Sequence, residues 1–162
     1  MNRFEPDVLA LAQALRERGL KLATAESCTG GLIAAACTAL AGSSDWFERG
    51  FVTYSNEAKT ESLGVDAALI AAHGAVSEEV ARAMAEGALA HSKAQVSLAV
   101  TGIAGPGGGS AAKPVGTVWL AWCVGGKTSS ECQVFAGDRA AVRAQTLRLA
   151  LTRINQLVEQ QS

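Results

Sequence analysis

The pattern of apolar and polar positions predicts an alternation of helices and strands. Residues 6–18 carry apolar side chains at helical spacing, which predicts an amphipathic helix ended by Gly19. Runs rich in apolar and β-branched residues predict five strands, at residues 21–25, 46–54, 96–101, 116–124 and 128–135. The last two are separated only by residues 125–127, Gly-Gly-Lys, so we expect them to form an antiparallel hairpin.

Further helices are expected between these strands. They span residues 32–40, 56 to about 64, 66–72, 77–91 and 138 to about 159. Strands that alternate with helices, together with one hairpin, are typical of helices packed on both faces of a sheet. We therefore expect residues 1–162 to form a single three-layer α/β/α domain with a mixed, mostly parallel five-stranded sheet.

Composition narrows the classes of partner. The chain is 49% hydrophobic and 18% charged, as in an ordinary globular domain, and its formal net charge is −1. With no overall basic charge, we expect neither nucleic acid nor a membrane surface as a partner. An anionic ligand must then be bound by a local cluster of donors.

The four cysteines are Cys28, Cys37, Cys123 and Cys132, and no two are spaced as C-x-x-C. Neither histidine is near them in sequence, so we expect no structural metal site. The N-terminal residues 1–18 include acidic side chains and do not read as a signal peptide. Free thiols without an export signal indicate a cytoplasmic protein.

Three loops are expected to meet at one edge of the sheet, because ligands bind beyond the carboxyl ends of parallel strands. The loops comprise residues 26–31, 54–59 and 101–114, and each contains reactive or glycine residues. The first reads Glu26, Ser27, Cys28, Thr29, Gly30, Gly31, directly before a helix that offers unpaired N–H groups. Here Ser27 and Cys28 are candidate nucleophiles, and the alternative is that Ser27 or Thr29 only caps the helix.

The spacing disfavours a serine–histidine mechanism. His73 precedes a glycine that ends a helix, His91 lies far along an alanine-rich helix, and the G-x-S-x-G motif is absent. A desolvated lysine is the alternative base, and Lys59 is the natural choice, with Tyr54 near it to relay or orient a proton. The alternative is an exposed helix lysine and a tyrosine packed in the core.

The third loop supplies backbone N–H donors without obstructing side chains. It contains Thr101, Gly102, Ile103, Gly105 and Gly107, but matches neither the phosphate loop nor the dinucleotide fingerprint. It could hold an oxyanion, a ribose or a phosphate, or it could be a mobile lid. In the final helix, Arg139 and Arg143 are four residues apart in the first turns, where cations oppose the helix dipole. An anionic ligand or an acidic partner would explain that placement.

Six segments in order resemble the CinA carboxy-terminal domain family, and within it the stand-alone nicotinamide-nucleotide amidases. They are TAESCTGG (24–31), GSSDWFERGFVTYSNEAK (42–59), HGAVSEEV (73–80), TGIAGPGGG (101–109), KPVGTVW (113–119) and GDR (137–139). They cover nearly the whole length. Two-domain relatives carry a further amino-terminal domain, whose functions we do not transfer.

The resemblance implies hydrolysis of the carboxamide of nicotinamide mononucleotide (NMN) to nicotinate mononucleotide and ammonia, in pyridine nucleotide recycling. It implies Ser27 as nucleophile, Lys59 as general base and Tyr54 as its partner, without a cofactor or metal, in a homodimer or higher homo-oligomer. Glu26 would face the cationic ring of the substrate or pair with Lys59. The substrate-binding residues would be Glu26, Thr29, Gly30, Gly31, Asn56, Thr101, Gly102, Ile103, Gly105, Gly107, Arg139 and Arg143. The rival hypothesis is a non-catalytic nucleotide-binding or interaction module linked to competence or DNA damage.

Overall fold

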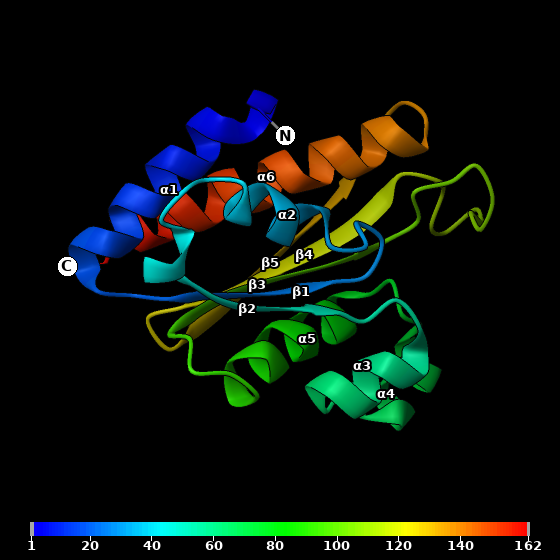
Figure 1. Cartoon of the computed structure of the whole chain (residues 1–162). Coiled ribbons are helices and arrows are strands. Elements are labelled where there is room, and N and C mark those ends of the chain that lie inside the picture. The colour runs from blue at the N-terminus through cyan, green and yellow to red at the C-terminus, as the bar shows by residue number, and fades with distance from the viewer. Residues whose placement is uncertain (1, 162) are drawn as a thin grey trace.

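A five-stranded sheet with the strand order β2-β1-β3-β4-β5 runs through residues 2–161, which the computed structural model describes (Figure 1). Its strands are β1 (Leu22–Glu26), β2 (Phe47–Val52), β3 (Val96–Gly102), β4 (Thr117–Val124) and β5 (Lys127–Val134). β1 pairs in parallel with β2 and β3, whereas β4 is antiparallel to both β3 and β5. Four strands therefore run in one direction and β4 runs against them, which confirms the mixed, mostly parallel sheet.

Helices cover both faces of the sheet and confirm the three-layer arrangement (Figure 1). One face carries α1 (Glu5–Arg18), α2 (Leu32–Thr38) and α6 (Arg139–Glu159), and the other α3 (Asn56–Leu63), α4 (Ala67–His73) and α5 (Glu78–Ala90). Short 3₁₀ helices occupy Asn2–Phe4 and Ser43–Asp45. No helix between residues 2 and 161 is long and apolar enough to span a bilayer.

The two faces of the sheet differ in side-chain size. Large residues such as Leu98 and Leu120 face α1 and α6, whereas Ala99 and Ala121 face α5. Successive strand residues point to opposite faces, so this difference follows from the sequence. Alanines allow α5, itself rich in alanine, to pack closely on the sheet. Gly87 continues this close packing, because a Cβ there would collide with the carbonyl oxygen of Leu63 on α3.

All predicted element boundaries agree with the structure to within two residues. The strand predicted at residues 46–54 is shorter in the structure, because β2 ends at Val52, opposite the last residue of its neighbour β1. The helix predicted to reach residue 40 ends at Thr38. In the hairpin, Gly125 and Gly126 alone form the turn, with φ of 62° and 76°. Such left-handed conformations suit a two-residue turn, and Lys127 begins β5.

Candidate active site

A cavity of about 290 Å³ opens where successive strands switch from one side of β1 to the other. From β1 the chain continues to β2 on one side, and β3 then lies on the other side of β1. Such switch points, at the carboxyl ends of parallel strands, are where ligands bind in open α/β sheets. The cavity is lined by Ser27, Cys28, Tyr54, Asn56, Lys59, Ala75, Val76, Thr101, Gly102, Ile103, Ala104, Gly105, Gly107, Gly108 and Arg139. The three predicted loops therefore meet here.

Ser27 is the first residue after β1 and is 8% exposed. Its backbone N–H donates to the Val100 carbonyl of β3 at 3.1 Å, which holds the residue at the end of the sheet. Gly102 lies two residues after Val100 in β3, and residues two apart in a strand direct their backbone groups to the same side. The N–H of Gly102 therefore points to the side on which Ser27 lies.

Lys59 lies in the second turn of α3, a helix that Ser55 caps through a bond from the Ala58 N–H. Although it is a lysine, the residue is only 1% exposed. Its Nζ lies 3.1 Å from Ser27 Oγ and 3.1 Å from the Thr53 carbonyl oxygen. The Tyr54 and Ser55 carbonyl oxygens lie within 3.4 Å. The amine is therefore held at the serine hydroxyl by the loop that follows β2.

Burial shifts the ionisation of two groups in the cavity. It lowers the pKa of Lys59, because the charged ammonium loses its hydration, and so favours the neutral amine that can accept a proton. It raises the pKa of Cys28 to about 11, so the thiol remains protonated near neutral pH. Burial therefore distinguishes Ser27, which has a neutral base within reach, from Cys28, which is an un-ionised thiol.

The Tyr54 hydroxyl is bonded elsewhere than at Lys59. Its oxygen accepts a hydrogen bond from Arg139 Nη2 at 3.2 Å, and the side chain is 62% exposed. Only the Tyr54 backbone carbonyl meets the lysine, at 3.3 Å. The distance between Lys59 and Ser27 allows direct proton transfer without a relay.

Glu26 is fully buried and is bonded to α2. Its carboxylate accepts hydrogen bonds from the Thr29 hydroxyl at 2.6 Å and from the backbone N–H groups of Ile33 and Ala34 at 2.8 and 3.0 Å. It thus caps a helix whose own N-cap, Gly31, has no side chain. Of the two alternatives for Glu26, the pairing with Lys59 is wrong, because these bonds hold the carboxylate at the helix N-terminus, where the free N–H groups and the dipole stabilise it.

Gly30 and Gly31 form the turn between Ser27 and α2, with φ of 59° and 104°. The Gly30 N–H donates to the Ser27 carbonyl at 3.1 Å and is thereby engaged in the turn. Arg143 lies against the same turn, donating from Nη2 to the Thr29 carbonyl at 3.0 Å. Glu26, Thr29, Gly30, Gly31 and Arg143 therefore surround the nucleophile turn rather than line the cavity.

The glycine loop after β3 forms the opposite wall. The Thr101 hydroxyl donates to the Ala75 carbonyl at 2.9 Å and joins this wall to the segment before α5. Arg139 donates from Nη1 to the Gly105 carbonyl at 2.9 Å. Sequence reasoning assigned no role to Ala75 or Val76, although both belong to the segment HGAVSEEV. Small residues carry no chemical signal, so only the tertiary structure identifies them.

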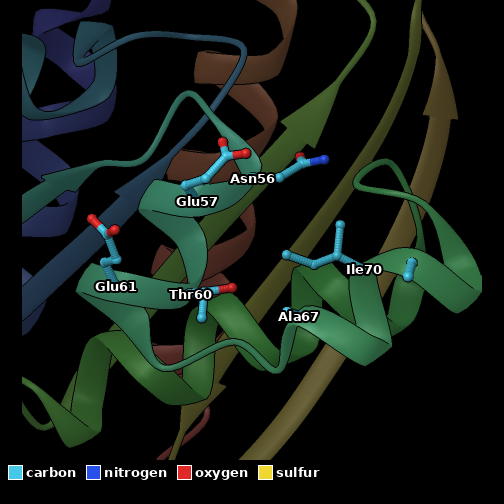
Figure 2. A pocket seen from close by; sticks show the side chains of 7 residues that line it. Asn56, Glu57, Thr60, Glu61, Ala67 and Ile70 are labelled. Atoms are coloured by element: carbon cyan, nitrogen blue, oxygen red, sulfur yellow. The ribbon is translucent and has the colours of Figure 1, made fainter.

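Two further cavities adjoin the site. One, of about 370 Å³, lies between α3 and α4 and is lined by Asn56, Glu57, Thr60, Glu61, Ala67, Ile70 and Ala71. Figure 2 shows the carboxylates of Glu57 and Glu61 one turn apart on α3, with Ile70 on α4. The other, of about 680 Å³, is lined by Ala104, Pro106, Val115, Gly137, Asp138, Arg139, Ala140 and Arg143. The surroundings are therefore acidic beside α3 and rich in arginine beside α6.

Comparison with known proteins identifies the family. The model of the CinA C-terminal domain matches residues 7–158. The chain belongs to the CinA C-terminal domain family. The nicotinamide-nucleotide amidohydrolase PncC of Pseudomonas putida is 56% identical over 91% of this chain and 92% of its own length. PncC of Escherichia coli K12 is 55% identical over 87% and 86%.

A solved structure has the same fold. The competence damage-inducible protein A of Klebsiella pneumoniae is 42% identical, with a TM-score of 0.93 over 97% of this chain and 98% of that one. The CinA family and fold implied by the sequence motifs are thus confirmed.

Proposed function

We propose that this protein is an amidohydrolase that converts NMN to nicotinate mononucleotide and ammonia, as a step in pyridine nucleotide recycling. The observation that carries the proposal is the buried Lys59 amine, 3.1 Å from the Ser27 hydroxyl at the floor of the cavity. Burying a lysine without a carboxylate partner is costly, and catalysis gives a reason for it. The identity of 55% or more to curated PncC proteins supports the choice of substrate.

In the proposed reaction, neutral Lys59 accepts the Ser27 proton as Oγ attacks the carboxamide carbon. The tetrahedral intermediate then expels the amine, which takes the proton back from Lys59 and leaves as ammonia. Lys59 then accepts a proton from water, which attacks the acyl-serine ester, and returns that proton to Ser27 Oγ as the carboxylate product leaves. No step requires a metal ion or a cofactor.

We assign the stabilisation of the oxyanion to backbone donors at the end of β3. The N–H of Gly102 points to the Ser27 side, and only glycine fits at this position, because a Cβ would collide with Val118 and the Thr117 carbonyl oxygen. Removing one such donor typically lowers turnover about 100- to 1000-fold. The Gly30 N–H does not share this role, because it already donates to the Ser27 carbonyl. Its contribution is therefore to the shape of the turn.

We place the substrate phosphate on the Arg139 side, beside the loop containing Gly105 and Gly107. Arg139 lines the cavity, whereas Arg143 contacts the nucleophile turn. Asn56, Thr101 and Ile103 complete the proposed substrate contacts. Glu26 and Thr29 enter this proposal as supports of the Ser27 turn.

The location and the assembly of the protein stay predictions. Cys28, Cys37, Cys123 and Cys132 are all free thiols, which supports a reducing compartment such as the cytoplasm. A homodimer or higher homo-oligomer is implied by the family resemblance, and a single domain spanning residues 1–162 is expected from the alternation of helices and strands. Light scattering on the purified protein measures the assembly.

The test is release of ammonia and nicotinate mononucleotide from NMN by the wild type and by Ser27→Ala. We expect activity in the wild type and a loss of at least about 1000-fold in the variant, because its nucleophile is absent. Equal activity in both would move the nucleophile to Cys28. A wild type that NMN protects against heating, but that releases no ammonia, would instead support the rival hypothesis of a nucleotide-binding module.

A further inference from the structure

Arg139 carries a positive charge that no carboxylate neutralises within residues 2–161. Its two terminal nitrogens donate to neutral acceptors on opposite sides, the Gly105 carbonyl at 2.9 Å and the Tyr54 hydroxyl at 3.2 Å. Guanidinium has five N–H donors, so several remain for a ligand. The two bonds therefore fix the orientation of the group without cancelling its charge.

The Tyr54 side chain reaches Arg139 from a different part of the fold. Tyr54 lies in the loop between β2 and α3, whereas Arg139 is the first residue of α6. Both line the catalytic cavity. A ring that is 62% exposed contributes little to the core. We therefore attribute the role of the Tyr54 side chain to the hydrogen bond that its hydroxyl accepts from Arg139.

Charge decides which end of a zwitterionic nucleotide lies near Arg139. Glu57 and Glu61 line the cavity between α3 and α4 (Figure 2). Asn56 borders both this cavity and the catalytic one. A phosphate monoester carries a charge of about −1.5 to −2 at pH 7 and is repelled from that acidic side. The unneutralised guanidinium is the favourable partner, and it offers paired donors to phosphate oxygens.

We propose that the Tyr54 hydroxyl is a positioning group, which holds Arg139 for the substrate phosphate and so makes the enzyme select nucleotides over nucleosides. The inference rests on the proposed function and deepens it. It replaces the proton relay expected of Tyr54 with a role in specificity. Arginine has many rotamers, and fixing one of them before binding lowers the entropic cost of recognising the phosphate.

The test compares Tyr54→Phe with the wild type on NMN and on nicotinamide riboside, which lacks only the phosphate. We expect KM for NMN to rise about five- to tenfold, the effect of losing one typical hydrogen bond. The kcat for NMN, its pH profile, and both constants for the riboside should stay unchanged. Arg139→Ala should weaken NMN binding further, and adding Tyr54→Phe to it should have no extra effect, because both act through one contact.

Arg148→Ala is the matched control, since it removes an arginine of the same helix that contacts Asp7, the Phe4 ring and the Arg3 carbonyl, all outside the cavity. An equal loss on both substrates, a fall in kcat, a shifted pH profile or no change on NMN would each overturn the inference. If the wild type turns over neither substrate, the proposed function fails by itself. Calorimetric affinities of the same variants for NMN and the riboside then decide the positioning role.

Discussion

At the scale of single residues, the site depends on placing a lysine where lysines are rarely found. Lys59 is buried because the loop after β2 directs three carbonyl oxygens at its amine, and Ser27 Oγ is the remaining neighbour. Burial lowers the pKa of Lys59 and raises the pKa of the Cys28 thiol next to Ser27. One environment thus favours a neutral base and disfavours a competing thiolate nucleophile.

We predict that kcat/KM for NMN rises with pH and levels off above the lowered pKa of Lys59. The sign follows because only the neutral amine accepts the Ser27 proton, and its fraction grows as pH increases through that pKa. The midpoint should lie below about 10.4, the ordinary lysine value. A pH–rate profile between 5 and 10 measures it.

Lys59→Met and Lys59→Arg form the control pair for this role. Both should lose at least about 100-fold in turnover, since neither side chain can accept a proton near neutral pH. Substantial activity in Lys59→Arg would mean that the site needs a positive charge rather than a base.

At the scale of elements, the junction between β1 and α2 is held by a buried carboxylate. Glu26 satisfies two N–H groups of α2 and the Thr29 hydroxyl, so the last residue of the strand caps the helix that follows it. The turn between them carries Ser27. The position of the nucleophile is therefore coupled to the helix cap.

We predict that Glu26→Gln destabilises the protein by about 1–3 kcal/mol, because its amide presents donors to N–H groups that require an acceptor. Turnover should also fall as the Ser27 turn shifts. Urea unfolding followed by circular dichroism measures the free energy of unfolding. Glu159→Gln, at an exposed end of α6, is the control and should change neither quantity. Unaltered stability in Glu26→Gln would show that the cap does not depend on the charge.

At the scale of the whole molecule, the close packing of α3 on α5 determines where Lys59 lies. Gly87 of α5 leaves no space for a Cβ against the Leu63 carbonyl, and Leu63 follows Lys59 by one helical turn. The base is therefore positioned by a helix that contributes no side chain to the cavity.

We predict that Gly87→Ala lowers the free energy of unfolding by about 1–3 kcal/mol through overpacking and reduces kcat by moving α3. In an isolated helix the same change stabilises by about 1 kcal/mol, so a loss identifies the interhelical contact. Thermal melting and NMN kinetics on one preparation measure both. A more stable variant with normal turnover would contradict the prediction.

The sequence by itself determined the order of the elements, the mixed sheet and the three loops that meet beside Ser27 and Lys59. These follow from the periodicity of apolar residues, the positions of glycines and the order of the predicted strands along the chain, all of which can be read from the sequence. Only the tertiary structure decided that the Lys59 amine meets Ser27 across 32 positions, that the Tyr54 hydroxyl turns to Arg139, and that Glu26 caps α2. The direction of a polar side chain depends on which acceptors the packed elements bring within about 3 Å, and spacing along a chain does not specify that.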